Sequence, residues 1–220
     1  MDTYGYGGKK TTEISYYHAQ TGKTYTDTID FEIIDKNHDK LAQTISGYNG
    51  GSENAGLVFR GLISLRTVMN FNGKDWNGNL GLDGGGWAKS DMRAWLNSED
   101  FYGMLPQDLK KAIKTVVKYS DNGYYDYHPG PAVLTETQDK IYIASLEELN
   151  SHNPGYTIAG QGEPFVMFTD ANSRKVGDTY WTRSTAGARS YHTFCIIDLD
   201  GRLSITGGAN NLGVMVYFSI

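Results

Sequence analysis

The histidines and the single cysteine are the side chains of this chain best suited to catalysis or metal binding. The histidines are far apart, and no two have the spacing of metal ligands: His18, His38, His128, His152 and His192. Cys195 lies between Phe194 and Ile196, which predicts a buried apolar cysteine and not a nucleophile. No nucleophile-elbow, phosphate-loop or dinucleotide-binding motif is present in the sequence. We therefore predict no catalytic residues, no metal and no cofactor.

The charge pattern limits the class of partner. The net charge is −5 at pH 7 and the isoelectric point is about 5.5, whereas binding to a phosphate backbone requires clustered lysine and arginine. The densest basic run has helical spacing, which predicts a solvated helix face: Lys110, Lys111, Lys114 and Lys118. We therefore expect no nucleic-acid partner.

Composition also bears on compartment and fold. One cysteine precludes an intrachain disulfide, no apolar run approaches the ~20 residues that span a bilayer, and the first residues lack the features of a signal peptide. We expect synthesis in a cytoplasm without membrane insertion, which fits a cytoplasmic or a virion-associated protein. The 27 glycines and 16 tyrosines favour short strands and long loops over a helical bundle.

The first third of the chain alternates as β-strands do. Residues 11–34 predict a β-hairpin with its turn at 20–23, and residues 56–65 predict an apolar strand. Residues 70–86 are too rich in glycine and asparagine for a helix or a strand. A loop of that length inside a domain is often functional.

Two helices are predicted in the middle of the chain. Ser90 can cap a helix over residues 91–97, where apolar residues have helical spacing. Pro106 can open a second helix that runs over residues 107–117. These helices between terminal strands indicate an α+β fold.

The remaining segments are predicted to be short. Residues 120–131 read as a loop and 140–144 as a strand, and the sequence of residues 145–148 has the capping-box pattern of a helix start. After residue 180, short strands such as 194–199 alternate with turns, and the chain reaches an apolar strand over 213–220.

Four ordered motifs carry a family resemblance. They are Phe31-Glu-Ile-Ile-Asp-Lys-Asn-His38, Trp87-Ala-Lys-Ser-Asp-Met-Arg-Ala-Trp-Leu-Asn-Ser98, Asp139-Lys-Ile-Tyr-Ile-Ala-Ser-Leu-Glu-Glu148, and a closing set of Tyr180-Trp-Thr-Arg-Ser184, Phe194-Cys195, Asp200-Gly201 and Gly213-Val214. They resemble an uncharacterised domain family of gut bacteria and their prophages with the core motif W-x-x-S-x-x-R-x-W-L-N-S. The resemblance covers roughly residues 30–220.

That family is similar to the C-type-lectin-like fold of sulfatase-modifying factors and of the variable proteins of diversity-generating retroelements. The resemblance implies short twisted antiparallel sheets, two main helices and long ordered loops. Residues 1–34 would then be an N-terminal β-hairpin extension that serves oligomerisation or attachment, and residues 35–220 a ligand-binding domain. The closing Val214-Met-Val-Tyr-Phe218 departs from the family's Val-Arg-Pro-Ala-Phe, which puts any role of that arginine and proline in doubt.

The resemblance also raises functions that the residues do not favour. Calcium-dependent lectins of this fold bind the ion through carboxylates and amides, and Glu163-Pro-Phe165 and Trp76-Asn-Gly78 both depart from those motifs. Asp198-Leu-Asp-Gly201 is better explained by a β-turn. A sulfatase-modifying type of enzyme, with reactive cysteines near the C-terminus, is one alternative function. A structural domain of a phage or cell surface is the other.

Several motif residues are predicted to be structural. The tryptophans Trp87, Trp95 and Trp181 have apolar neighbours and are expected in the core. The arginines Arg93 and Arg183 are expected to hold loops through carboxylates or carbonyls.

In the variable proteins of retroelements, a hypermutated C-terminal segment on a fixed scaffold binds diverse ligands. The resemblance therefore implies a binding face between residues 180 and 220, where aromatic and basic side chains lie beside small polar ones, as in antibody paratopes. The predicted contact residues are Ala186, Ala188, Arg189, Ser190, Tyr191, His192, Thr193, Arg202, Ser204, Thr206, Asn210 and Asn211. The expected partner is an unknown protein or glycan on a cell surface.

Overall fold

The computed structural model describes residues 5–46, 52–71, 85–121, 133–186 and 193–220. Most of the two predicted loops, over 70–86 and 120–131, lies outside the described residues.

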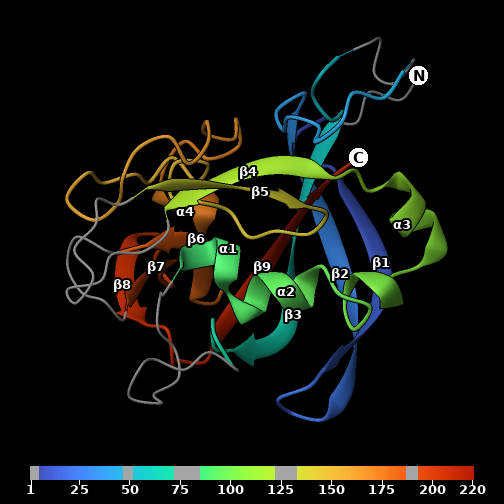
Figure 1. The fold of residues 1–220 in the computed structure, drawn as a ribbon, viewed down its shortest axis with the longest axis horizontal. Helices are drawn as coiled ribbons and strands as arrows, with labels where there is room; N and C mark the ends of the chain where they lie inside the picture. The colour runs from blue at the N-terminus through green and yellow to red at the C-terminus, as the bar shows by residue number, and fades with distance from the viewer. Residues whose placement is uncertain (1–4, 47–51, 72–84, 122–132, 187–192) are drawn as a thin grey trace.

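A seven-stranded mixed sheet, in the order β1-β2-β3-β9-β6-β7-β8, forms the centre of the described structure (Figure 1). Its strands are β1 (Lys9–His18), β2 (Lys23–Lys36), β3 (Leu57–Thr67), β6 (Tyr180–Thr185), β7 (Thr193–Ile197), β8 (Leu203–Gly207) and β9 (Leu212–Ser219). Neighbouring strands are antiparallel except β6 and β9, which are parallel. The apolar strand β9 lies in the middle of the sheet, and from Gly213 to Ser219 it is buried.

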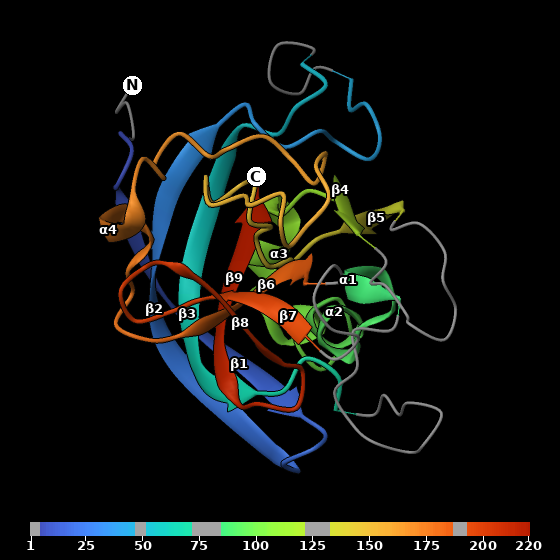
Figure 2. The same ribbon diagram turned by 90° about the vertical axis from the view of Figure 1, so that its left-hand side faces the viewer.

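A smaller layer covers one side of this sheet. It contains the two-stranded sheet of β4 (Val116–Asp121) and β5 (Leu134–Asp139), with the short helices α1 (Gly86–Lys89), α2 (Asp91–Leu96) and α3 (Gln107–Ala112). Helix α4 (Ala171–Arg174) lies on the opposite side of β2, as Figure 2 shows. Within the described residues, no helix is both long enough and apolar enough to cross a membrane.

The predicted α+β class with two main helices is wrong, and with it the C-type-lectin-like architecture. Strands hold most of the regular structure, and no α-helix in the described part of the chain exceeds six residues. The helix predicted over 107–117 ends at Ala112 because the next residues are mostly β-branched. Such side chains favour strands, and Val116 begins β4. The apparent helical spacing of the lysines was therefore coincidental beyond Ala112.

Two shorter predictions near residue 145 also differ from the structure. The capping-box contacts are present, since the Glu148 amide donates to the Ser145 hydroxyl at 3.1 Å and the Ser145 amide donates to the Glu148 carboxylate at 3.0 Å. They enclose a turn and not a helix. Residues 140–144 form no strand, although Tyr142 makes one isolated bridge with Tyr217 of β9.

Other local predictions are confirmed. The N-terminal hairpin pairs in register from Lys9↔Glu32 to His18↔Lys23, and Ser90 caps α2 by accepting the Arg93 amide at 3.1 Å. The hairpin is also part of the large sheet, because β2 pairs with β3 and Tyr16 packs in the same core as β9.

His18, at the end of β1, is a buried histidine with incomplete hydrogen bonding. Its ring packs edge-on against Phe71 and Trp95, at centroid distances of 5.0 and 4.9 Å. Its Nε2 lies 3.3 Å from the Thr67 hydroxyl, and its Nδ1 has no partner among the described residues. Burial lowers the pKa of His18 below its ordinary value of 6.5.

We expect His18→Phe to make stability less dependent on pH. The unfolded chain binds a proton at His18 near pH 6.5, whereas the folded chain does so only at lower pH. Protonation therefore favours unfolding, and stability falls as the pH drops below 6.5. Urea unfolding at several pH values between 7.5 and 5 measures this decline, which should be shallower in the variant. A decline as steep as that of the parent chain would contradict the assignment.

Candidate ligand-binding site

Strand pairing brings Thr193, one predicted contact residue, next to the second segment in which contact residues were predicted. Thr193 pairs with Gly207 and Phe194 pairs with Thr206 in the antiparallel β7–β8 ladder. The Ala186 amide donates to the Thr193 carbonyl at 3.0 Å. Ala186 and Thr193 therefore lie close to the start of the turn at 207–211. We call Thr193, Thr206 and residues 207–211 the β7–β8 rim.

The polar groups of this rim are partly fixed in place. The Asn210 side-chain amide donates to the Thr206 hydroxyl at 2.6 Å and to the Gly207 carbonyl at 3.2 Å. Arg66 of β3 donates to the Asn211 carbonyl at 3.1 Å. Asn210 and Asn211 are exposed, while Thr193 and Thr206 are half-buried.

Other predicted contact residues have different positions. Ala186 is fully buried, so its side chain offers no surface to a ligand. Arg202 precedes β8 at the far end of the strand, five residues from Gly207, which corresponds to about 16 Å along a strand. Ser204 is half-buried and pairs with Ile196 on β7. The remaining predicted residues lie outside the described ones: Ala188, Arg189, Ser190, Tyr191 and His192.

The motif tryptophans and Arg93 have structural roles, as predicted. Trp181 on β6 is fully buried and donates its indole N–H to the Thr67 carbonyl at 2.8 Å. Trp87 and Arg93 both donate to the buried carboxylate of Asp139, at 3.0 and 2.6 Å. Trp95 is also buried. These side chains form scaffold and not a ligand platform.

The structure also shows where the cysteine and the acidic pair singled out in the sequence lie. Cys195 on β7 is fully buried as predicted, and burial raises the pKa of its thiol well above its ordinary value. The segment from Asp198 to Gly201 forms the predicted turn, closed by the Gly201 amide and the Asp198 carbonyl at 2.9 Å. Within the described residues, no three His, Cys, Asp or Glu side chains form a metal-binding group.

A buried charge cluster, which the sequence did not indicate, joins four distant parts of the chain. It comprises Asp39, Lys118, Glu148 and Arg183, all at most 3% exposed at their side chains. The Lys118 ammonium lies 2.5 Å from the Asp39 carboxylate and 2.9 Å from the Glu148 carboxylate. Arg183 donates to the other oxygen of Glu148. Two buried acids are therefore paired with two buried bases.

Charge pairing sets the ionisation of the two acids. Burial alone would raise the pKa of Asp39, but the positive charge of Lys118 and hydrogen bonds from His38 and Lys118 hold that pKa well below its ordinary value. Burial likewise opposes ionisation of Glu148, and the charges of Arg183 and Lys118 hold its pKa below the ordinary value. Both carboxylates are thus charged in the folded chain.

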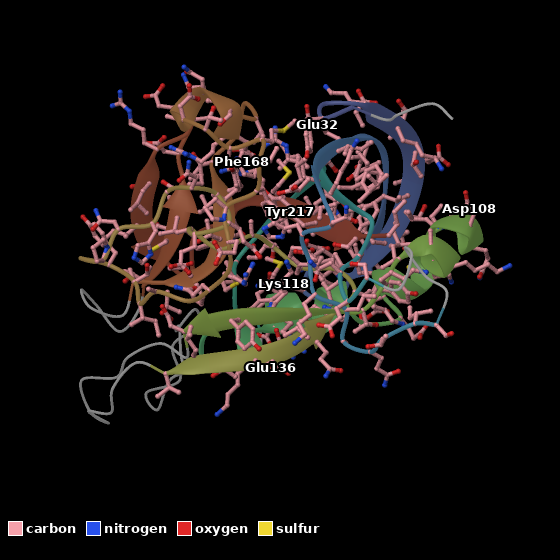
Figure 3. All side chains as sticks on the ribbon, turned by 90° about the horizontal axis from the view of Figure 1, so that it is seen from above. Glu32, Asp108, Lys118, Glu136, Phe168 and Tyr217 are labelled. Atoms are coloured by element: carbon pink, nitrogen blue, oxygen red, sulfur yellow. The ribbon has the colours of Figure 1, made fainter. Side chains whose placement is uncertain are left out.

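The assignment of Lys118 to a solvated helix face is wrong. Lys118 lies on β4, and alternation along that strand turns its side chain inward together with Val116 and Ser120. Figure 3 shows Lys118 on the inner side of the β4–β5 sheet, with Glu136 on the outer side. Its ammonium also lies 3.9 Å from the centroid of the Tyr142 ring. No local pattern indicates this position, because the inward positions of β4 include the polar Lys118 and Ser120 and the outward ones the apolar Val117 and the aromatic Tyr119.

Comparison with known proteins places the chain in one family. No curated protein and no solved structure matches the chain. A family model described as a domain of unknown function, DUF6273, matches residues 60–220, from within β3 through β9. The matched region contains the β7–β8 rim and three of the four members of the buried charge cluster. The chain therefore belongs to the DUF6273 family.

Proposed function

We propose that the chain is a non-catalytic ligand-binding protein whose contact surface is centred on the β7–β8 rim. The observation that carries this proposal is the pairing of Thr193 with Gly207, which brings Thr193 beside the turn that contains Asn210 and Asn211. Contact residues that are separate in sequence can then touch one ligand together.

The chemistry and rigidity of the rim support recognition. Exposed amides and half-buried hydroxyls can donate and accept hydrogen bonds, and the bond between Asn210 and Thr206 reduces the freedom that binding would remove. The adjoining strands β6 and β7 are buried over nearly their whole length, so substitutions in the rim need not disturb the core. Under this proposal the ligand is a protein or a glycan on a cell surface.

Diversification by a retroelement is part of the same proposal. It would concern residues 186–193 and 202–211, which are joined by the scaffold strand β7. A neighbouring reverse transcriptase gene, with a near-copy of the segment that encodes residues 180–220 and mismatches at adenines, would support it. Absence of such a near-copy would remove diversification and leave ligand binding intact.

The rim can be tested by comparing variants at the two ends of β8. We expect the double variant Thr206→Ala with Asn210→Ala to reduce binding to responsive features of a glycan array, or to intact bacterial cells, by about tenfold or more, because it removes several hydrogen-bonding groups at once. Arg202→Ala, at the far end of β8, should leave the same signals within about twofold. Unfolding midpoints of both variants should stay close to that of the parent chain.

The opposite ranking would contradict the proposal. Strong loss with Arg202→Ala and none with the double variant would move the contact surface to the other end of β8. Loss of folding in the double variant would show that the rim is part of the core.

A further inference from the structure

A cavity of about 130 Å³ lies directly over the buried charge cluster. Its inner wall contains Lys118, Glu148 and Arg183, whereas Lys40 and Glu163 at its mouth are exposed. The cavity therefore connects solvent with buried charges. Its volume is enough for about four water molecules or for one small organic group.

The acids below this cavity have little remaining capacity to accept hydrogen bonds. One Asp39 oxygen accepts from Lys118 and His38, and the other accepts from Tyr142 and Ser219. The Glu148 oxygens accept from Lys118, from Arg183 and from the Ser145 amide. A ligand that offers only donors would find few free lone pairs here.

The bases retain unused donors. Arg183 uses four of its five N–H groups, on the carbonyls of Tyr119, Ile143 and Gln161 and on Glu148. Lys118 uses two of its three N–H groups on carboxylates. For each cation, one N–H has no oxygen acceptor within the described part of the chain. The cavity therefore favours a ligand that accepts hydrogen bonds.

His38 at the cavity wall adds a positive charge. Its Nδ1 lies 2.8 Å from the Asp39 carboxylate and its Nε2 lies 3.0 Å from the Glu163 carbonyl. Both partners are acceptors, so both ring nitrogens must carry protons, which makes the ring an imidazolium. Although burial lowers the pKa of His38, the hydrogen bond and charge of Asp39, reinforced by Glu148, raise it above the ordinary value.

The charges around the cavity then leave one positive charge unbalanced. His38, Lys118 and Arg183 face the two acids Asp39 and Glu148, and at the mouth Lys40 and Glu163 cancel. We propose that this cavity is a binding site for a small monocarboxylate, held by the spare N–H groups of Arg183 and Lys118 beside the His38 imidazolium. The site is separate from the β7–β8 rim and does not depend on the function proposed for it.

Acetate, acetamide and inorganic phosphate distinguish the possible ligand chemistries. In the parent chain at pH 6, acetate is ionised and His38 is protonated, so titration should shift the His38 ring NMR signal saturably. Raising the pH removes the proton from His38, so acetate should bind more weakly at pH 9 than at pH 6. Acetamide has the same size without the charge and should bind at least tenfold more weakly at pH 6.

Two histidine variants provide a matched comparison. His38→Gln should weaken acetate binding about tenfold at pH 6 and remove its pH dependence between pH 6 and 9. His152→Gln alters a histidine beside the neighbouring acid Glu147, 3.8 Å away, and should leave acetate binding unchanged. The Thr206→Ala with Asn210→Ala variant should also bind acetate normally, which separates this site from the rim.

Several results would overturn the proposal without any variant. They are the absence of a saturable His38 shift with acetate, equal affinity for acetamide, tighter binding of phosphate than of acetate, and an affinity for acetate that is the same at pH 6 and pH 9.

Discussion

Replacing Lys118 with methionine is expected to lower the free energy of unfolding by about 3–5 kcal/mol, because it leaves the buried carboxylates of Asp39 and Glu148 with too little positive charge. Lys118 is only 3% exposed and contacts both acids directly. Methionine keeps much of the side-chain volume, so the loss measures charge and not a cavity. Urea unfolding at pH 7 gives the difference.

Lys111→Met is the matched control for this change. Lys111 belongs to the same basic run in the sequence, but it is exposed on α3, and its replacement should change stability by no more than about 0.5 kcal/mol. Adding Asp39→Asn to Lys118→Met should recover part of the loss by removing one unpaired buried charge. Equal effects of Lys118→Met and Lys111→Met would show that the cluster does not matter for stability.

Gly201→Ala is expected to destabilise the fold by about 2–5 kcal/mol, from backbone strain together with overpacking. Gly201 has a φ of 74°, in the left-handed region that favours glycine. An added Cβ would also overlap the carbonyl oxygen of Ala171, which belongs to the backbone of α4 and cannot turn away. The Gly201 carbonyl accepts from Arg174 at 2.8 Å, so any shift would disturb that bond as well.

Gly22→Ala separates the two contributions. Gly22, in the hairpin turn, has a similar φ of 66°, but a Cβ there would meet no atom within 4 Å. This variant should lose only the conformational part, about 1–2 kcal/mol, as measured by thermal or urea unfolding. A loss at Gly201 no larger than that at Gly22 would mean that α4 moves freely to accept the methyl group.

Local features of the fold were predictable where one short segment contains its own determinants. The N-terminal hairpin follows from alternation and from a turn that contains Gly22, and the start of α2 follows from Ser90 followed by helically spaced apolar residues. Burial of Cys195 and of Trp181 follows from their apolar neighbours. Each of these predictions depends on one continuous stretch of the chain, the longest being residues 11–34 of the hairpin.

The predictions that failed depend on partners elsewhere in the chain. Leu109, Ile113 and Val116 have helical spacing, but Val116 instead pairs with Asp139 of β5, which no local pattern reveals. The β-branched residues after Ala112 favour a strand, and pairing with β5 supplies its partner. The family resemblance led to the wrong architecture for a similar reason, because motifs describe local environments and not the order of strands.

In the candidate sites, too, the sequence revealed local features but not contacts between distant residues. Polar character around residues 202–211 was visible in the sequence, but the separation of Arg202 from the rim required the β7–β8 register. The buried charge cluster draws on positions 39, 118, 148 and 183, and no spacing rule connects such distant residues. Only the folded chain brings them together.

The central position of β9 has a consequence for how the protein forms during synthesis. Val58 of β3 pairs with Ser219 of β9, and β9 also joins β3 to β6. On the ribosome, the hairpin and β3 can assemble early, but the sheet stays in two parts until residue 219 has left the exit tunnel. Such long-range pairing slows folding, and β3 meanwhile presents an open edge that invites aggregation. We therefore expect the sheet to close only after β9 has been synthesised, and its folding to benefit from chaperones that shield the edge of β3.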